Sequence, residues 1–359
     1  MALRISMNAR KVTGPYGGGN QFATNLEAYL VEQGHTVYRT LVPDLDIILI
    51  VSSNVNQQTA SYNIQAIQDY ITLNPNTMVI HRINTCDEPR GMDLGLNQTM
   101  LRVNQIADGT IYISNFLREL FAGYGMDMHK PNAVAFNGAD ENIFYPMGRA
   151  EWSSGEKLRI VTHHWSSNYL KGFDIYERLD QLLAIKPYQD LFEFTYIGNI
   201  PLGVNFQHTK VIKPIAGAEL ADALRSQHVY LTAARHEAAG MHHVEGVRCG
   251  LPVLFINSGA LPEYCHPYGI EFTLINFEQK LMEMHQNYTD YRIKVLDCPY
   301  SATWMAEQYE QMFIDLTTNR QIQPEPSILK KLQHTVVTRP QRAFNKVRGL
   351  GTKAIKYLR

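Results

Sequence analysis

Short apolar segments recur along the chain and alternate with segments of helical periodicity, and this alternation constrains the fold more than any other feature. Parallel strands need crossover connections, which are usually helices, so the pattern predicts parallel sheets with helices on both faces. Each apolar segment has the length of one buried strand and is too short to span a bilayer. The candidate strands are residues 3–7, 36–39, 47–51, 78–83, 110–114, 133–137, 158–163, 192–197, 210–213, 229–234, 251–257 and 270–273.

A polar stretch at residues 148–157 divides these segments into two series. The 359 residues are enough for two domains with separate cores. We therefore expect an α/β chain with two Rossmann-like, doubly wound parallel-sheet domains, at 1–148 and 149–299, that face a central cleft. A long helix is expected over 305–316, and residues 317–359 form a separate tail.

A glycine run lies between the first candidate strand and the first helix. Gly17, Gly18 and Gly19 precede Asn20, and the amphipathic helix that follows is expected to end before Gly34. Adjacent glycines allow a ligand to approach the backbone closely, and a helix start favours phosphate or sugar oxygens. The spacing is not that of a dinucleotide-binding loop, and the second strand does not end in an acid that would hold a ribose. A nicotinamide-dependent oxidoreductase is therefore the least favoured class.

Two glutamates, Glu237 and Glu245, stand eight positions apart where a strand gives way to a helix. The first lies at the carboxyl end of a strand, where open α/β sheets bind ligands. The turn and helix start between them, Ala239, Gly240 and Met241, present backbone N–H groups that suit a phosphate. One carboxylate can hold sugar hydroxyls and the other ribose hydroxyls, with a diphosphate between them.

This segment, with the Gly-Leu-Pro-Val at 250–253, resembles the motif of retaining glycosyltransferases of the GT-B fold, those of glycosyltransferase family 4 in particular. The resemblance implies that the first domain is on the acceptor side and the second binds a nucleotide-sugar. It also implies that the helix at 300–316 crosses back onto the first domain. Family members carry a similar glycine-rich loop near the donor phosphates, and they end the first domain with a signature matched here by residues 136–146.

The resemblance also assigns a lysine to the donor diphosphate. Lys171, followed by Gly172, fits that position, but the arginine that family members carry five residues earlier is replaced by Ser166. His164 or Arg235 is then expected to supply the second positive partner.

Further sites follow from the resemblance or from strand ends. His81, and after it Asp87, are candidates for touching the transferred sugar, although a histidine at a strand end is as often structural. Gly198 and Asn199 end a strand where relatives form the wall around the base. Glu263 is expected either to orient donor-side residues or to cap a helix.

The charge of the chain is unevenly distributed. Nine of the 33 Lys and Arg residues, and no Asp or Glu, lie in 327–359, which leaves 24 basic against 34 acidic residues elsewhere. This basic, partly apolar tail is expected either to touch an anionic membrane surface or to remain a solvated appendage. Nucleic acid is not an expected partner, because no aromatic platform accompanies the charges.

The four cysteines lack metal-type and redox-type spacing, and the N-terminus lacks the apolar core of a signal peptide. We therefore expect a cytoplasmic protein with free thiols, in peripheral contact with a membrane if the tail binds one. The sequence shows no pattern of metal ligands, so no metal and no other cofactor is expected.

The resulting hypothesis is a metal-independent, retaining hexosyltransferase that moves a sugar from a nucleotide diphosphate-sugar to a hydroxyl of a glycan or lipid-linked acceptor. Glu237, Lys171 and His81 are the expected catalytic residues. Two alternatives stay open: a nucleotide-sugar epimerase or hydrolase with the same architecture, and a nucleotide-sugar-binding protein without turnover.

Overall fold

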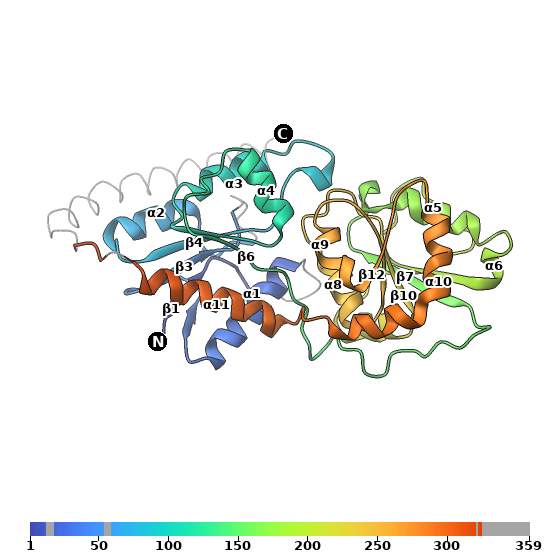
Figure 1. Cartoon of the computed structure of the whole chain (residues 1–359). Helices are drawn as coiled ribbons and strands as arrows, with labels where there is room; N and C mark the ends of the chain where they lie inside the picture. Colours follow the sequence, from blue (N-terminus) through green and yellow to red (C-terminus); the bar gives the residue numbers. More distant parts are fainter. Residues whose placement is uncertain (12–17, 54–58, 321, 325–359) are drawn as a thin grey trace, which may run out of the picture.

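The computed structural model describes residues 1–11, 18–53, 59–320 and 322–324, which form two lobes, each built on a six-stranded parallel sheet (Figure 1). Helices flank both sheets, so the predicted fold class of two doubly wound α/β domains is confirmed. The expected tail contacts at 327–359 and Gly17 of the glycine run lie outside the described residues.

The N-terminal lobe has the strand order β2-β1-β3-β4-β5-β6, with every neighbouring pair parallel. Its strands are β1 Arg4–Met7, β2 Thr36–Tyr38, β3 Ile47–Ile50, β4 Met78–Ile83, β5 Gly109–Tyr112 and β6 Asn132–Val134. Its helices are α1 Gly18–Glu32, α2 Ile64–Leu73, α3 Leu96–Asn104 and α4 Asn115–Gly123, with a 3₁₀ turn η1 at Glu88–Arg90.

The C-terminal lobe repeats the arrangement with the strand order β12-β11-β10-β7-β8-β9. Its strands are β7 Leu158–His164, β8 Phe192–Gly198, β9 Lys210–Ile212, β10 Val229–Thr232, β11 Val253–Ile256 and β12 Gly269–Phe272. Its helical elements are η2 Tyr169–Lys171, α5 Phe173–Leu182, α6 Tyr188–Leu191, α7 Gly217–Arg225, α8 Met241–Arg248, α9 Leu261–Cys265, η3 His266–Tyr268, α10 Phe277–Lys294 and η4 Val295–Asp297.

Strand β3 explains why the apolar runs lack a polar face. Ile47 and Leu49 pack with α1 and the last helix, whereas Ile48 and Ile50 pack with α2 on the other side of the sheet. Successive side chains of a strand point to opposite faces, so a sheet covered on both faces needs a continuous apolar sequence.

The last helix, α11 (Ala302–Thr318), returns to the N-terminal lobe and lies beside α1 (Figure 1). Met305, Tyr309 and Phe313 are buried there in the same cluster as the side chains of α1. The return point requires Gly138, since a Cβ at that position would lie 1.9 Å from the carbonyl oxygen of Ser301. Gly138, near the end of the first domain, is therefore needed for close backbone contact.

Several hydrogen bonds join the two lobes where the start of α4 meets α9 and the loop after β10. Glu263 of α9 accepts from the backbone N–H groups of Asn115 and Phe116, both at 2.7 Å, so it caps α4 of the other lobe. Ser114 Oγ donates to the carbonyl oxygen of Ala238 at 2.8 Å. Of the two roles expected for Glu263, the structure shows helix capping, across the lobe boundary.

Element ends differ from expectation by a few residues. The strand expected to reach Ser114 ends at Tyr112, because Ser114 is the N-cap of α4 and its hydroxyl accepts from the N–H of Leu117. The first helix begins at Gly18, two residues before its expected start. Among the described residues, none of the helices is both long enough and apolar enough to cross a membrane.

Candidate active site

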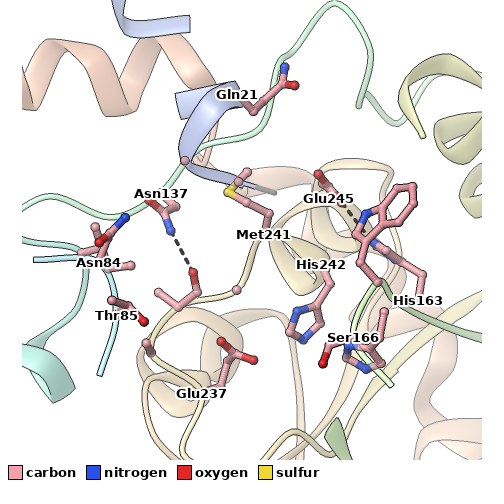
Figure 2. A pocket seen from close by; sticks show the side chains of 18 of the residues that line it. Gln21, Asn84, Thr85, Asn137, His163, Ser166, Glu237, Met241, His242 and Glu245 are labelled. Atoms are coloured by element: carbon pink, nitrogen blue, oxygen red, sulfur yellow. Dashed lines mark hydrogen bonds and ion pairs between the residues drawn. The ribbon is translucent and has the colours of Figure 1, made fainter. Parts of the chain in front are cut away.

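A cavity of about 500 Å³ lies between the two lobes. Its N-terminal wall comes from the start of α1 and the segment after β4, and its C-terminal wall from the ends of β7 and β10 and the start of α8. In Figure 2, Asn84, Thr85 and Asn137 lie on the left, and His163 and Glu245 on the right. The carboxyl ends of parallel strands from both sheets therefore meet at one place, which is where ligands bind in open α/β folds.

Glu237 and Lys171 form an ion pair in the wall of the cavity, with Lys171 Nζ 2.7 Å from Glu237 Oε2. Glu237 follows β10, and its side chain is 7% exposed; Lys171 ends η2 before α5, and its side chain is 21% exposed. Burial by itself raises the pKa of Glu237, but the charge of Lys171 and its hydrogen bond outweigh this and hold the pKa below its ordinary value. The carboxylate is therefore ionised at neutral pH and fixed in direction.

The loop that carries Glu237 is held by its neighbours. Gly259 packs so closely that a Cβ would lie 2.4 Å from the backbone nitrogen of Glu237, and Ala260 N–H donates to its carbonyl oxygen at 2.7 Å. His236 and Ala239, on either side, have backbone φ angles of +52° and +146°, which residues other than glycine rarely adopt. Strained backbone held in this way is common at functional sites.

Glu245 lies in α8 and lines the same cavity, where its Oε2 is 2.8 Å from His163 Nε2 (Figure 2). The other ring nitrogen of His163 is 3.1 Å from the hydroxyl of Tyr230. His163 therefore stands between a buried tyrosine and the carboxylate and orients the latter.

The start of α8 faces the cavity through Gly240 and Met241. Gly240 is the N-cap and offers no side-chain acceptor, and the first turn contains no acidic residue. The first backbone N–H groups of a helix have no partner within it and carry the positive end of its dipole, so they suit an anion. The start of α1 is close by, because a Cβ at Gly18 would lie 2.9 Å from Met241 Cγ.

The expected second positive partner is not where the sequence suggested. Arg235 is absent from the cavity wall, and its guanidinium pairs with Asp174 at 2.6 Å and donates to the carbonyl oxygen of Ala233. His164 does line the cavity, but it is 4% exposed and lies 2.8 Å from the hydroxyl of Tyr176. Burial, then the charge of Lys171, hold the pKa of His164 well below its ordinary value, so it is uncharged at neutral pH. Neither residue therefore provides a positive charge to the cavity in this structure.

The N-terminal candidates His81 and Asp87 do not line the cavity either. His81 is fully buried, 2.7 Å from Ser53 Oγ, and burial lowers its pKa to about 3. Asp87 accepts from the backbone N–H groups of Leu94 and Asn97, both at 3.0 Å, which shapes the loop before α3. Both residues have structural partners, which is the alternative that the sequence left open for His81.

Gly198 and Asn199 do not line the cavity, but both contact the backbone of residues that do. A Cβ at Gly198 would lie 2.0 Å from the carbonyl oxygen of His164, and Asn199 Nδ2 donates to the carbonyl oxygen of Trp165 at 2.7 Å. Gly18 and Gly19 line the cavity itself, whereas Asn20 does not. The glycine run therefore reaches the site through its last two glycines.

The structure adds wall residues that sequence reasoning did not select. They include Gln21, Arg82, Asn84, Thr85, Arg90, Asn137, His163, Trp165, Ser166 and His242. Several follow β4 or β7, so their positions at strand ends were the available signal. Among the described residues, no three His, Cys, Asp or Glu side chains are grouped in a way that could hold a metal ion.

Two facing parallel sheets, a cavity between them and a last helix that returns to the first lobe define the GT-B fold. A glycosyltransferase from Rickettsia africae and a sucrose-phosphate synthase from Thermosynechococcus elongatus each match with a TM-score of 0.63 and 13% sequence identity, over 89% of this chain and all of theirs. HepE from Anabaena, solved with UDP-glucose, matches with a TM-score of 0.62 and 14% identity over 88% of this chain and all of its own. No protein-family model and no curated protein sequence matches the chain. At these identities the likeness establishes the fold alone.

Proposed function

We propose that this protein is a retaining glycosyltransferase that moves a hexose from a nucleoside diphosphate-sugar to a hydroxyl of a glycan or a lipid-linked acceptor. The observation that carries the proposal is the convergence of Glu237, Lys171 and Glu245 on one interlobe cavity, around an open helix start. A carboxylate for the sugar, positive groups for the diphosphate and a second carboxylate for the ribose are the groups that such a donor needs.

Each group has a role in donor binding. Glu245, oriented by His163, accepts hydrogen bonds from the ribose hydroxyls. The N–H groups at Gly240 and Met241 hold the diphosphate, and Lys171 neutralises part of its charge. Glu237 accepts hydrogen bonds from hydroxyls of the transferred sugar. Because an ammonium group has three donors, Lys171 can keep its bond to Glu237 and still bind a phosphate oxygen.

The chemical step is a substitution at C1 of the sugar. The bond from C1 to the phosphate oxygen breaks, and its electron pair goes to that oxygen, where Lys171 and the dipole of α8 stabilise the developing charge. The acceptor hydroxyl forms the new bond on the same face, and its proton passes to the departing phosphate. The step requires no metal, since an ammonium group and a helix start supply the positive charge.

The first donor to test is UDP-glucose, because HepE, which shares the fold, has been solved with it. The rival activity, epimerisation or hydrolysis of the donor, would be served by carboxylates facing C1 from both lobes. Among the described residues of the N-terminal wall, none is an Asp or Glu. That distribution favours transfer over the rival activity.

The test follows release of nucleoside diphosphate from a panel of donors, beginning with UDP-glucose, with and without acceptor glycans. We expect release to need an acceptor and to fall at least a hundredfold in Glu237→Gln and in Lys171→Ala, about 3 kcal/mol of transition-state stabilisation each. Glu193→Gln and Lys186→Ala are matched controls, because both side chains are exposed and neither lines the cavity. Undiminished turnover in both active-site variants, or release that ignores acceptors, would refute the proposal.

A further inference from the structure

Arg82, near the end of β4, is a buried arginine without an acidic partner among the described residues. It is 3% exposed. Its Nε donates to the hydroxyl of Tyr309 at 3.0 Å and its Nη2 to Asn137 Oδ1 at 2.9 Å, and the ring of Phe22 lies 3.8 Å from the guanidinium carbon. All three contacts are to uncharged groups. Its third nitrogen, Nη1, is buried and has no hydrogen-bond partner in the described part of the chain.

Such a side chain is costly to keep in the folded protein. Removing a guanidinium from water requires compensation by hydrogen bonds and by negative charge, and an unmade hydrogen bond adds to the cost. Tyr309 and Asn137 satisfy two nitrogens but contribute no charge. An anion that contacts Nη1 would supply both the missing hydrogen bond and the missing charge.

Arg82 lines the interlobe cavity together with Gly18, Gly19 and Gln21 from the start of α1, whereas its Nη1 is itself covered, so the guanidinium has to turn slightly for Nη1 to meet an anion in the cavity. That helix has fifteen residues and no acidic residue in its first turn, so its positive end is not offset there. A buried cation with an unpaired donor and a helix start therefore share the N-terminal wall of a cavity whose opposite wall carries Lys171.

We propose that Arg82 and the start of α1 form a second anion subsite, which binds a phosphate group inside the cavity from the N-terminal lobe. The subsite deepens the proposed function and rests on it for the source of the phosphate. That source is either the donor diphosphate, held between the lobes by Arg82 and Lys171, or a phosphate on the acceptor. In the first case Arg82 replaces, from the other lobe, the arginine whose usual position is occupied by Ser166.

The subsite is connected to the loop of Glu237. Asn137, which accepts from Arg82, donates through Nδ2 to the carbonyl oxygen of Ala239 at 2.8 Å (Figure 2). An anion on Arg82 therefore fixes the same asparagine that holds the strained loop after β10. Binding at the N-terminal wall would steady the position of Glu237 in the C-terminal wall.

The test measures binding of pyrophosphate, inorganic phosphate and UDP by calorimetry, which needs no turnover. In Arg82→Met, which keeps an unbranched side chain but removes the charge and the donors, we expect pyrophosphate to bind at least tenfold more weakly than in the wild type. Arg102→Met, which removes an exposed arginine from α3 of the same lobe, serves as the control and is expected to bind as the wild type does. If the methionine variant does not fold, Arg82→Lys replaces it, and the loss of the planar fork is expected to weaken binding at least threefold.

The two sources give different results. If the donor supplies the phosphate, UDP affinity falls in Arg82→Met along with pyrophosphate affinity. If the acceptor supplies it, UDP affinity is unchanged, and inorganic phosphate still binds to UDP-saturated wild type but not to the UDP-saturated variant. Wild-type affinity of the variant for all three ligands would overturn the subsite.

Failure of the subsite and failure of the proposed function are distinguishable. UDP binding that is lost in Lys171→Ala but unaffected in Arg82→Met, with no effect of the latter on phosphate, leaves the function standing and removes the subsite. Arg82-dependent pyrophosphate binding in a protein that binds and turns over none of the nucleoside diphosphate-sugars of the panel leaves the subsite standing and removes the function.

Discussion

Glu237 is a buried carboxylate whose ionised form depends on one neighbour. Burial opposes its charge, and Lys171 reverses that effect at a distance of 2.7 Å. Removing one member of a buried pair leaves an uncompensated charge, whereas removing both leaves none. The pair therefore has consequences for stability that can be measured without any substrate.

We expect Lys171→Ala to lower the free energy of unfolding by about 3 kcal/mol, at the low end for buried pairs because the lysine is partly exposed. Adding Glu237→Gln should restore part of that loss, since the amide carries no charge. Urea unfolding of the two single variants and the double variant measures both effects. Lys186→Ala, with 76% of its side chain exposed, should change the value by less than about 0.5 kcal/mol. A loss in Lys171→Ala no larger than that of this control would contradict the expectation.

His163 gives a prediction for donor binding. His163→Phe removes the hydrogen bond to Glu245, and the carboxylate is then less well fixed. We expect the Kd for the nucleoside diphosphate to rise about fivefold, the equivalent of one hydrogen bond worth about 1 kcal/mol, and the lost contact with the Tyr230 hydroxyl to lower the free energy of unfolding by about 1 kcal/mol. Calorimetry checks this, with the exposed His129→Phe as the control. An unchanged Kd would show that Glu245 needs no support from His163.

At the scale of elements, the contact between the end of the first lobe and the start of α11 depends on a glycine, Gly138. Gly138 meets the carbonyl oxygen of Ser301, and Ala139 N–H donates to the carbonyl oxygen of Tyr300 at 3.0 Å. The clash would involve backbone on both sides, so a flexible side chain cannot relieve it.

Gly138→Ala is therefore expected to destabilise the protein by roughly 3 kcal/mol, the upper range for overpacking, and to loosen α11 from α1. The melting temperature and hydrogen exchange of residues 302–318 measure the two effects. Gly123→Ala in α4 is the control, since a Cβ there meets nothing within 4 Å and alanine favours helix. Equal melting temperatures for the two variants would mean that the close approach is not required.

At the scale of the whole molecule, buried histidines govern the response to acid. Burial lowers the pKa of His81 to about 3 and of His228 and His243 to about 4. Burial and neighbouring positive charges hold the pKa values of His164 and His242 well below the ordinary value for histidine. The unfolded chain takes up protons on these side chains as the pH falls through about 6.5, whereas the folded protein does not until much lower pH.

The stability that these histidines contribute is therefore expected to be fully present above pH 7 and to be lost as the pH falls from about 6.5 towards 4, the folded-state pKa of His228 and His243. Each such histidine contributes a slope of up to about 1.4 kcal/mol per pH unit once its unfolded form is protonated. Urea unfolding at pH 7, 6 and 5 measures the fall. His228→Gln should reduce the slope by about one proton, and His129→Gln, at an exposed position, should leave it unchanged. A free energy of unfolding that is constant from pH 7 to 5 would contradict the expectation.

The strand and helix periods of the sequence predicted two parallel sheets, and the position of Glu237 after a strand and of Glu245 in a helix predicted a site at the carboxyl edge of the second sheet. The return of the last helix and the role of Lys171 were expected from the resemblance to known glycosyltransferases. The continuous apolar sequence of β3 predicted a strand correctly, because both faces of β3 are buried.

Only the tertiary structure decided which polar side chains reach the cavity. His81 and Arg82 are adjacent in β4, so their side chains point to opposite faces of the sheet; one lies beside Ser53 and the other lines the site. Arg235 forms an ion pair with Asp174, and His163 of β7 contacts Glu245 of α8. Each of these pairings joins segments that are far apart in the sequence but adjacent within one lobe, and no local pattern encodes such a contact.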